Sequence, residues 1–449
     1  MRSVLVTSLR RRALLTTTAA ALSALTLAVL PSSGAPGSSA PAASAASTRT
    51  VRSPQDVLGR QPQALNPVFS SPVSTSECRK QINRGCYSPL QYDKAYDLSP
   101  LYAEGITGKG RTIVITDSFG SPTIQHDLEV FDKQWGLPDT QVDVLKWGDV
   151  PAFDPTDPDM NGWADETTLD VEAAHAVAPG ARIVLVETGV SETEGPVGIP
   201  EMQSAINHLA KEGRGDVVSM SWATSEARFP GFDLGDYTSL TTLRYGFQAA
   251  ARHGVTLTAS SGDGGGHANR VDAAWPAGDP LVTAIGGTEL YLDDTGNRLK
   301  PDAAWSGSGG DHSKVFPRPS YQNPVASVVG PHRGTPDISM AASPDGALWL
   351  YSSYDPTRTG WTAGGNGTSE SSPLFAAVVA LADQLAGHRL GQVDGLLYRL
   401  YGRPNTGLVD VTTGSTGTNG FTAGPGYDQA TGLGTVDATK LVHALAGRR

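Results

Sequence analysis

A serine at the start of an apolar segment has the setting of a nucleophile. Ser369 follows the glycine-rich stretch 364–367, and Pro373 opens an apolar run over residues 374–385. This run predicts a buried helix with the proline in its first turn. Unpaired N–H groups and the helix dipole favour developing negative charge at that end. Serine is also a preferred N-cap residue, so the segment alone leaves a nucleophile and a helix cap both open.

Two carboxylates could supply the base that such a serine needs. Glu166 and Asp170 are four residues apart on a helix predicted for residues 166–177, so their side chains share one face. Burial of such a pair raises at least one pKa, and the pair can then hold a proton and accept another from a hydroxyl. Alternatively, both residues complement the dipole of a first helical turn. The apolar residues around them favour burial, where charges without a function are costly.

A third acidic residue lies among glycines. Asp263 belongs to the stretch 260–266, directly after a strand predicted for residues 255–259. Glycines allow a backbone to approach a ligand closely. A carboxyl that stays protonated there could donate a hydrogen bond to an oxyanion. An ordinary Asp-Gly turn is the alternative.

The C-terminal part offers hard oxygen ligands. Asp410 and Val411 are followed by a glycine-rich loop that contains Gly424, Gly426 and Asp428. Two carboxylates together with backbone carbonyls suit calcium, although the spacing is not that of an EF-hand. Acidic turn residues are the alternative interpretation.

Histidine is the usual base for a catalytic serine. His175 lies five residues after Asp170, which places it off the face shared by the two carboxylates. The G-x-S-x-G pattern is absent around Ser369. We therefore favour a structural role for His175 and keep the histidine-dependent hydrolase as a competing hypothesis.

These residues need a frame, and the segment order predicts one. Short apolar strands alternate with helices, which indicates an α/β fold with a mostly parallel central sheet and helices on both faces. Working residues in such a sheet belong at the carboxyl ends of strands. The predicted strands are 112–116, 182–187, 216–222, 255–259 and 281–285, and the further helices are 124–135, 202–211, 240–253 and 392–401.

The composition limits the classes of binding partner and the cellular compartment expected for this protein. The chain has 449 residues and a net charge of −11, which argues against nucleic acid or an anionic membrane as partner. The two cysteines, Cys78 and Cys86, are expected to form a disulfide in an oxidising compartment. We expect a secreted, monomeric protein.

The N-terminal residues predict export. Three arginines at 10–12 precede an apolar run and a stretch of small residues, the order of a signal peptide over residues 1–45. The arginines also permit a twin-arginine route. Residues 46–75 predict a linker or propeptide remnant, and residues 76–449 the folded domain. No membrane contact is expected after cleavage.

Together the motifs resemble the sedolisin family, the serine-carboxyl peptidases related in fold to subtilisins. The resemblance runs from about Tyr92 to Val442 and keeps one order of motifs. E-x-x-x-D comes first, then S-x-S-W, S-G-D, G-T-S-x-x-x-P, and a final Asp followed by G-x-G-x-D. The family implies a subtilisin-like fold and peptide hydrolysis at acidic pH.

The resemblance also assigns roles. It implies that Ser369 is the nucleophile, Glu166 its base, Asp170 the residue that orients Glu166, and Asp263 the acid of the oxyanion hole. It implies that Trp222 lines the substrate cleft. One structural calcium ion would be bound by Asp410, Val411, Gly424, Gly426 and Asp428.

Two departures and two alternatives accompany this assignment. Family members usually carry a long folded prosegment, whereas about thirty linker-like residues separate the predicted signal peptide from Cys78 here. Glu370 stands where the family usually has a small or apolar residue, and a carboxylate beside the nucleophile could alter its pH response. We expect an endopeptidase acting on proteins or peptides; the alternatives are a tripeptidyl-peptidase and a catalytically silent peptide-binding relative.

Overall fold

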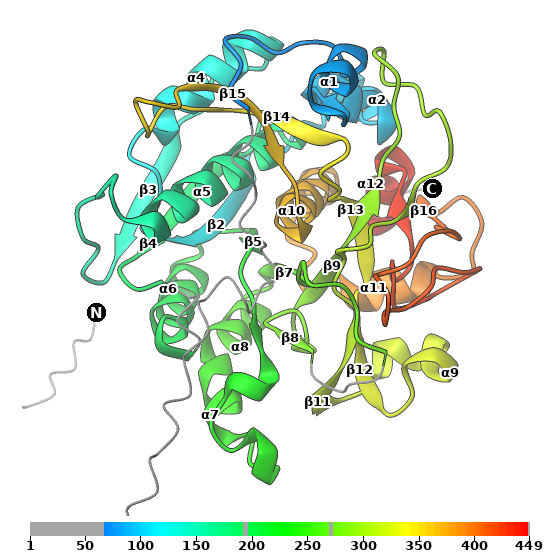
Figure 1. Ribbon diagram of the computed structural model, residues 1–449. Coiled ribbons are helices and arrows are strands. Elements are labelled where there is room, and N and C mark those ends of the chain that lie inside the picture. Colours follow the sequence, from blue (N-terminus) through cyan, green and yellow to red (C-terminus); the bar gives the residue numbers. More distant parts are fainter. Residues whose placement is uncertain (1–66, 192–195, 269–272, 448–449) are drawn as a thin grey trace, which may run out of the picture. The chain divides into compact units, whose positions relative to one another are not determined.

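The computed structural model (Figure 1) describes residues 67–191, 196–268 and 273–447. The predicted signal peptide and most of the predicted linker lie outside these residues. Within the described ranges, no helix has both the length and the hydropathy needed to cross a membrane.

A mostly parallel sheet forms the frame, as predicted; it has eight strands, of which β3, β10 and β13 were not predicted. Its strand order is β10-β9-β7-β5-β2-β4-β3, and β13 also pairs with β9. Every pair is parallel except β10 with β9. The strands are β2 (Thr112–Ser118), β3 (Val142–Trp147), β4 (Arg182–Thr188), β5 (Val217–Met220), β7 (Thr256–Ser260), β9 (Thr283–Glu289), β10 (Ala303–Ala304) and β13 (Ile338–Ala341).

Helices cover both faces of the sheet (Figure 1). Side chains alternate along each strand, so Ile113 and Ile115 of β2 belong to one apolar core while Val114 belongs to another. The first core contains α4 (Ile124–Trp135), α5 (Pro158–Val177) and α10 (Thr368–Ala386). The second contains α6 (Ile199–Glu212) and α8 (Tyr245–Arg252). The first core therefore holds both helices that carry predicted catalytic residues.

Shorter elements surround this frame. The helices are α1 (Thr75–Ile82), α2 (Pro89–Ala95), α3 (Ser99–Ala103), α7 (Thr238–Thr241), α9 (Ala326–Val329), α11 (Asp394–Leu400) and α12 (Ala438–Leu445). The strands are β1 (Cys86–Tyr87), β6 (Thr224–Ser225), β8 (Ala274–Trp275), β11 (Asp311–Pro317), β12 (His332–Thr335), β14 (Ala347–Ser352), β15 (Gly360–Gly365), β16 (Leu408–Val409) and β17 (Thr435–Val436).

Three helices begin earlier than predicted, among them α6, which starts three residues early at Ile199. The side chain of Asp157 caps α5, and Pro158 opens that helix eight residues before the predicted start. Helix α10 begins at Thr368, so Pro373 lies inside the helix instead of in its first turn. Ser369 is thus the second residue of α10.

The folded part also begins before the predicted boundary at residue 76. Phe69 exchanges two backbone hydrogen bonds with Trp361 of β15, at 2.8 and 2.9 Å, and its ring meets Trp349 edge to face. These contacts order the end of the predicted linker. Cys78 and Cys86 form a disulfide that closes the turn after α1.

Candidate active site

The backbone before α10 brings Asp263 to the predicted nucleophile. Gly367 caps the helix with φ of 85°, a conformation that glycine adopts readily. A side chain at this position would place its Cβ 2.5 Å from Oδ2 of Asp263. The next residue, Thr368, donates its N–H to Oδ1 of Asp263 at 2.7 Å and its hydroxyl at 2.8 Å. Asp263 therefore lies directly at the N-terminus of the helix that carries Ser369.

Pro373 leaves the carbonyl of the predicted nucleophile without its usual partner in the helix. An interior proline has no N–H for the carbonyl four residues earlier, which here belongs to Ser369. The hydroxyl of Ser221 lies 3.1 Å from that carbonyl oxygen and 2.8 Å from Oδ1 of Asp170. One hydroxyl proton serves one acceptor fully. The hydroxyl of Ser221 therefore lies between the two acceptors and can donate to Asp170 or to the carbonyl of Ser369.

A further acid, which the sequence analysis did not identify, adjoins Glu166. Asp117 is the last residue but one of β2 and is fully buried, and its Oδ2 accepts the hydroxyl of Thr167 at 3.1 Å. Burial first, and then the charge of Glu166, raise the pKa of Asp117 well above its ordinary value. An acidic residue at the carboxyl end of an apolar parallel strand is the signal that identifies it.

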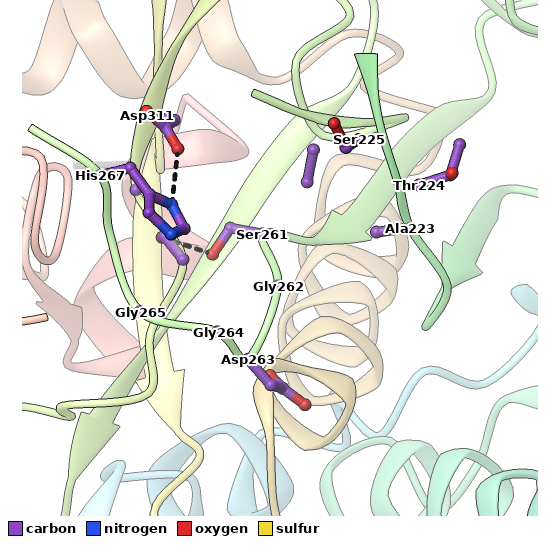
Figure 2. A pocket seen from close by; sticks show the side chains of 13 residues that line it. Ala223, Thr224, Ser225, Ser261, Gly262, Asp263, Gly264, Gly265, His267 and Asp311 are labelled. Atoms are coloured by element: carbon purple, nitrogen blue, oxygen red, sulfur yellow. Dashed lines mark hydrogen bonds and ion pairs between the residues drawn. The ribbon is translucent and has the colours of Figure 1, made fainter. Parts of the chain in front are cut away.

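A pocket opens beside Asp263 (Figure 2). Ala223, Thr224 and Ser225 form one side, while His267 and Asp311 form the other, with Nδ1 of the histidine 3.2 Å from Oδ2 of the aspartate. The cavity measures about 100 Å³, small beside the roughly 300–1,000 Å³ of small-molecule sites. It has room for a single side chain of a larger ligand.

Trp222 is not brought to this pocket. Its side chain is 1% exposed and belongs to the second core, where it lies 6.3 Å from the ring of Trp275. Its indole N–H donates to the hydroxyl of Thr116 at 3.2 Å. The residues that follow it, beginning with Ala223, line the pocket instead.

The side chain of Glu370 contacts Tyr92 instead of any predicted catalytic residue. It is fully buried, and its carboxylate accepts the hydroxyl of Tyr92 on α2. Burial raises the pKa of Glu370 well above its ordinary value. Burial at this position therefore favours the neutral form of the Glu370 side chain.

His175 occupies the interface between α5 and α4. Its Nε2 lies 3.0 Å from Oδ1 of Asp132 and 3.1 Å from the carbonyl oxygen of Pro138, with both side chains of the ion pair fully buried. These contacts explain His175 as a structural residue. They give no support to a histidine base.

The C-terminal loop gathers the residues predicted to bind calcium. Asp410 accepts the N–H of Gly426 at 2.9 Å, and Asp428 accepts that of Gly424 at 2.8 Å. Burial raises the pKa of Asp428. The carbonyl oxygens of Val411, Gly424 and Gly426 accept no hydrogen bond from the described residues, so the donor set fits a hard cation.

Carboxylates alone do not make this loop a metal site. The described part of the chain contains no group of three or more His, Cys, Asp or Glu side chains placed to hold a metal. Binding in the loop would therefore depend on backbone carbonyls beside its two carboxylates.

Comparisons with known proteins agree with this architecture. Residues 159–394 match the family model described as the subtilase family. Kumamolisin of Bacillus sp. (strain MN-32) is 31% identical over 80% of this chain and 63% of its own length. Sedolisin of Pseudomonas sp. (strain 101) is 27% identical over 79% of this chain and 60% of its own. The chain thus spans about 60% of the length of these curated relatives.

A solved structure supports the same relationship. It is the Pseudomonas sedolisin, a serine-carboxyl proteinase complexed with two molecules of pseudo-iodotyrostatin, and it superposes with a TM-score of 0.69. The match is 25% identical and covers 81% of this chain and 99% of that one. The fold, the family match and these relatives lead to one conclusion: the chain belongs to the subtilase family and, within it, to the sedolisins.

Proposed function

We propose that this protein is an acid-active serine-carboxyl endopeptidase. The observation that carries the proposal is the link from Asp170 through Ser221 to the carbonyl of Ser369, with Glu166 on the same helix as Asp170. In the proposed reaction Ser369 attacks a peptide carbonyl and Glu166 takes its proton. An acyl-enzyme forms, the amine leaves with a proton, and water then hydrolyses the ester.

Asp263 would stabilise the oxyanion. It lies at the N-terminus of α10, where the helix dipole also favours negative charge, and it must be protonated to donate. Glu166 must be ionised to accept the serine's proton. Only an acidic medium satisfies both demands, so we expect activity to fall toward neutral pH. The pocket beside Asp263 would hold one substrate side chain.

The test is peptide digestion from about pH 3 to pH 8. Wild type should work in the acidic half, whereas Ser369→Ala and Glu166→Gln should lose at least about 1,000-fold in kcat. Matched controls are Ser371→Ala on the same helix and Asp165→Asn beside Glu166, and both should remain active. Activity that survives in Ser369→Ala, or that is confined to neutral pH, would reject the proposal.

Three finer points belong to the same proposal. Tripeptidyl-peptidase 1 of Bos taurus is 33% identical over 44% of this chain. The test compares peptides that have a free amino terminus with N-acetylated peptides, because a tripeptidyl-peptidase requires a free amino terminus.

Export is tested by sequencing the N-terminus of protein recovered from the medium. The C-terminal loop is proposed to hold one structural Ca²⁺. The ion would contact the carboxylates of Asp410 and Asp428 in place of some of their hydrogen bonds within the loop.

A further inference from the structure

A row of charged side chains crosses three neighbouring strands. Asp117 of β2 is the register partner of Glu187 on β4, and Glu187 is the register partner of Lys146 on β3. Register partners in a parallel sheet project to the same face. The three side chains therefore lie side by side at the carboxyl end of the sheet, on the face that α5 covers.

The row leads from the buried acids to the surface. Asp117 is fully buried, the side chain of Glu187 is 6% exposed, and that of Lys146 is 62% exposed. The amino group of Lys146 lies 3.7 Å from Oε2 of Glu187. Glu187 also packs against Gly120, where a Cβ would collide with its carboxylate. This packing fixes the carboxylate beneath the turn that follows β2.

The inner end of the row meets the predicted base. Thr167, the neighbour of Glu166 on α5, donates to Asp117. Burial first, then the charge of Glu166 and, to a smaller degree, that of Glu187 raise the pKa of Asp117. Burial raises the pKa of Glu187, while Lys146 lowers it. Lys146 and Asp117 are thus the charged groups around Glu187, and Glu166 lies beyond Asp117.

We propose that Glu187 and Lys146 act as positioning residues for charge: through Asp117 they set the proton occupancy of Glu166 and Asp170. The inference rests on the proposed function for its catalytic meaning. The predicted change in the titration of the buried acids does not depend on the proposed function, because it follows from the charges around these acids. Nothing in the catalytic roles assigned above uses Glu187 or Lys146.

The two residues have opposite effects in this scheme. Glu187→Gln removes a negative charge, so the remaining acids should release their protons at lower pH. Lys146→Met removes a positive charge, so they should release them at higher pH. Each of these shifts should amount to about half a pH unit to one pH unit. A purely structural role predicts no such opposition.

The first measurement is the pH profile of kcat/KM for peptide cleavage, whose acid-side limb reports ionisation of the base. This limb should move to lower pH in Glu187→Gln and to higher pH in Lys146→Met. Glu187→Asp, which restores a carboxylate, should return the limb toward the wild-type position. Asp143→Asn is the control, since Asp143 is on β3 but on the opposite face of the sheet, and it should leave the limb unchanged.

The second measurement does not need activity. Infrared spectra of Ser369→Ala protein follow the carbonyl stretch of the buried protonated acids against pH, with the band of Asp117 assigned by its loss in Asp117→Asn. The titration of this band should shift in the same two directions. Unshifted titrations, or equal shifts in both variants, would overturn the inference even if the enzyme cleaves peptides. Opposite shifts in a protein without activity would uphold it and reject the proposed function.

Discussion

The C-terminal end of α10 carries an acid whose removal should make the protein more stable above neutral pH. Asp383 is fully buried. Its Oδ1 accepts the N–H of Leu390 at 2.7 Å, and Oδ2 has no hydrogen-bond partner among the described residues. Burial, and then the charge of Asp216, raise the pKa of Asp383 to about 7.

The sign and size of the effect follow from linkage. The folded-state pKa lies above the ordinary value of 3.8, so the folded protein holds a proton that the unfolded chain releases. The resulting stability is complete below about pH 4 and is lost as the pH rises through about 7. At 1.36 kcal/mol per pKa unit, the loss in free energy of unfolding is about 4 kcal/mol.

Asp383→Asn keeps the acceptor for Leu390 and cannot ionise. Its stability relative to wild type should therefore rise by about 4 kcal/mol between pH 4 and pH 8, or by about 4–8 °C in Tm for a folded unit of this size. The assay is thermal unfolding at several pH values in Ser369→Ala protein, which prevents self-digestion.

Asp355→Asn is the matched control. Hydrogen bonds from the hydroxyl and N–H of Thr357 lower the pKa of Asp355, so this exposed carboxylate is ionised throughout the range. Its difference from wild type should not change between pH 4 and pH 8. A pH-independent difference for Asp383→Asn as well would refute the assignment of a retained proton to Asp383.

Three further predictions concern the site and the C-terminal loop. Ser221→Ala removes the link between Asp170 and the carbonyl of the nucleophile; kcat should fall about 10-fold with KM unchanged, and an unaltered kcat in steady-state assays would contradict the link. Ala274 also lines the pocket beside Asp263, and Ala274→Leu fills this pocket, so KM should rise at least about 10-fold for peptides with a bulky residue before the cleaved bond; an unchanged preference would show that this pocket holds no substrate side chain. Chelation of calcium should lower the Tm of wild type by several degrees and that of Asp410→Asn much less, whereas equal changes would argue against the site.

Sequence reasoning identified most residues of the candidate site because they stand beside recognisable structural signals. Ser369 follows glycines and precedes a helix, and Asp263 follows a strand. Asp117 carries an equally simple signal at a strand end, but its importance depends on which helix covers that strand. Packing across the sheet, which a linear pattern does not specify, decides this.

Other residues were misplaced for local reasons. The start of α5 was predicted too late, although Asp157 and Pro158 are the usual cap and opening residue of a helix. Trp222 is adjacent to the pocket in sequence, yet its side chain packs in the second core beside Trp275, a tertiary contact that the local sequence does not specify. The contact of Ser221 with Asp170 joins residues 51 positions apart, and local spacing gives no indication of it.

The proline inside α10 has a mechanical consequence. Because Pro373 has no N–H, the helix cannot complete its own hydrogen-bond ladder there, and the carbonyl of Ser369 contacts the hydroxyl of Ser221 from outside the helix instead. The orientation of the turn that carries the nucleophile therefore depends on a side chain from another segment of the chain. A change at residue 221 can reach Ser369 without altering the sequence of the helix itself.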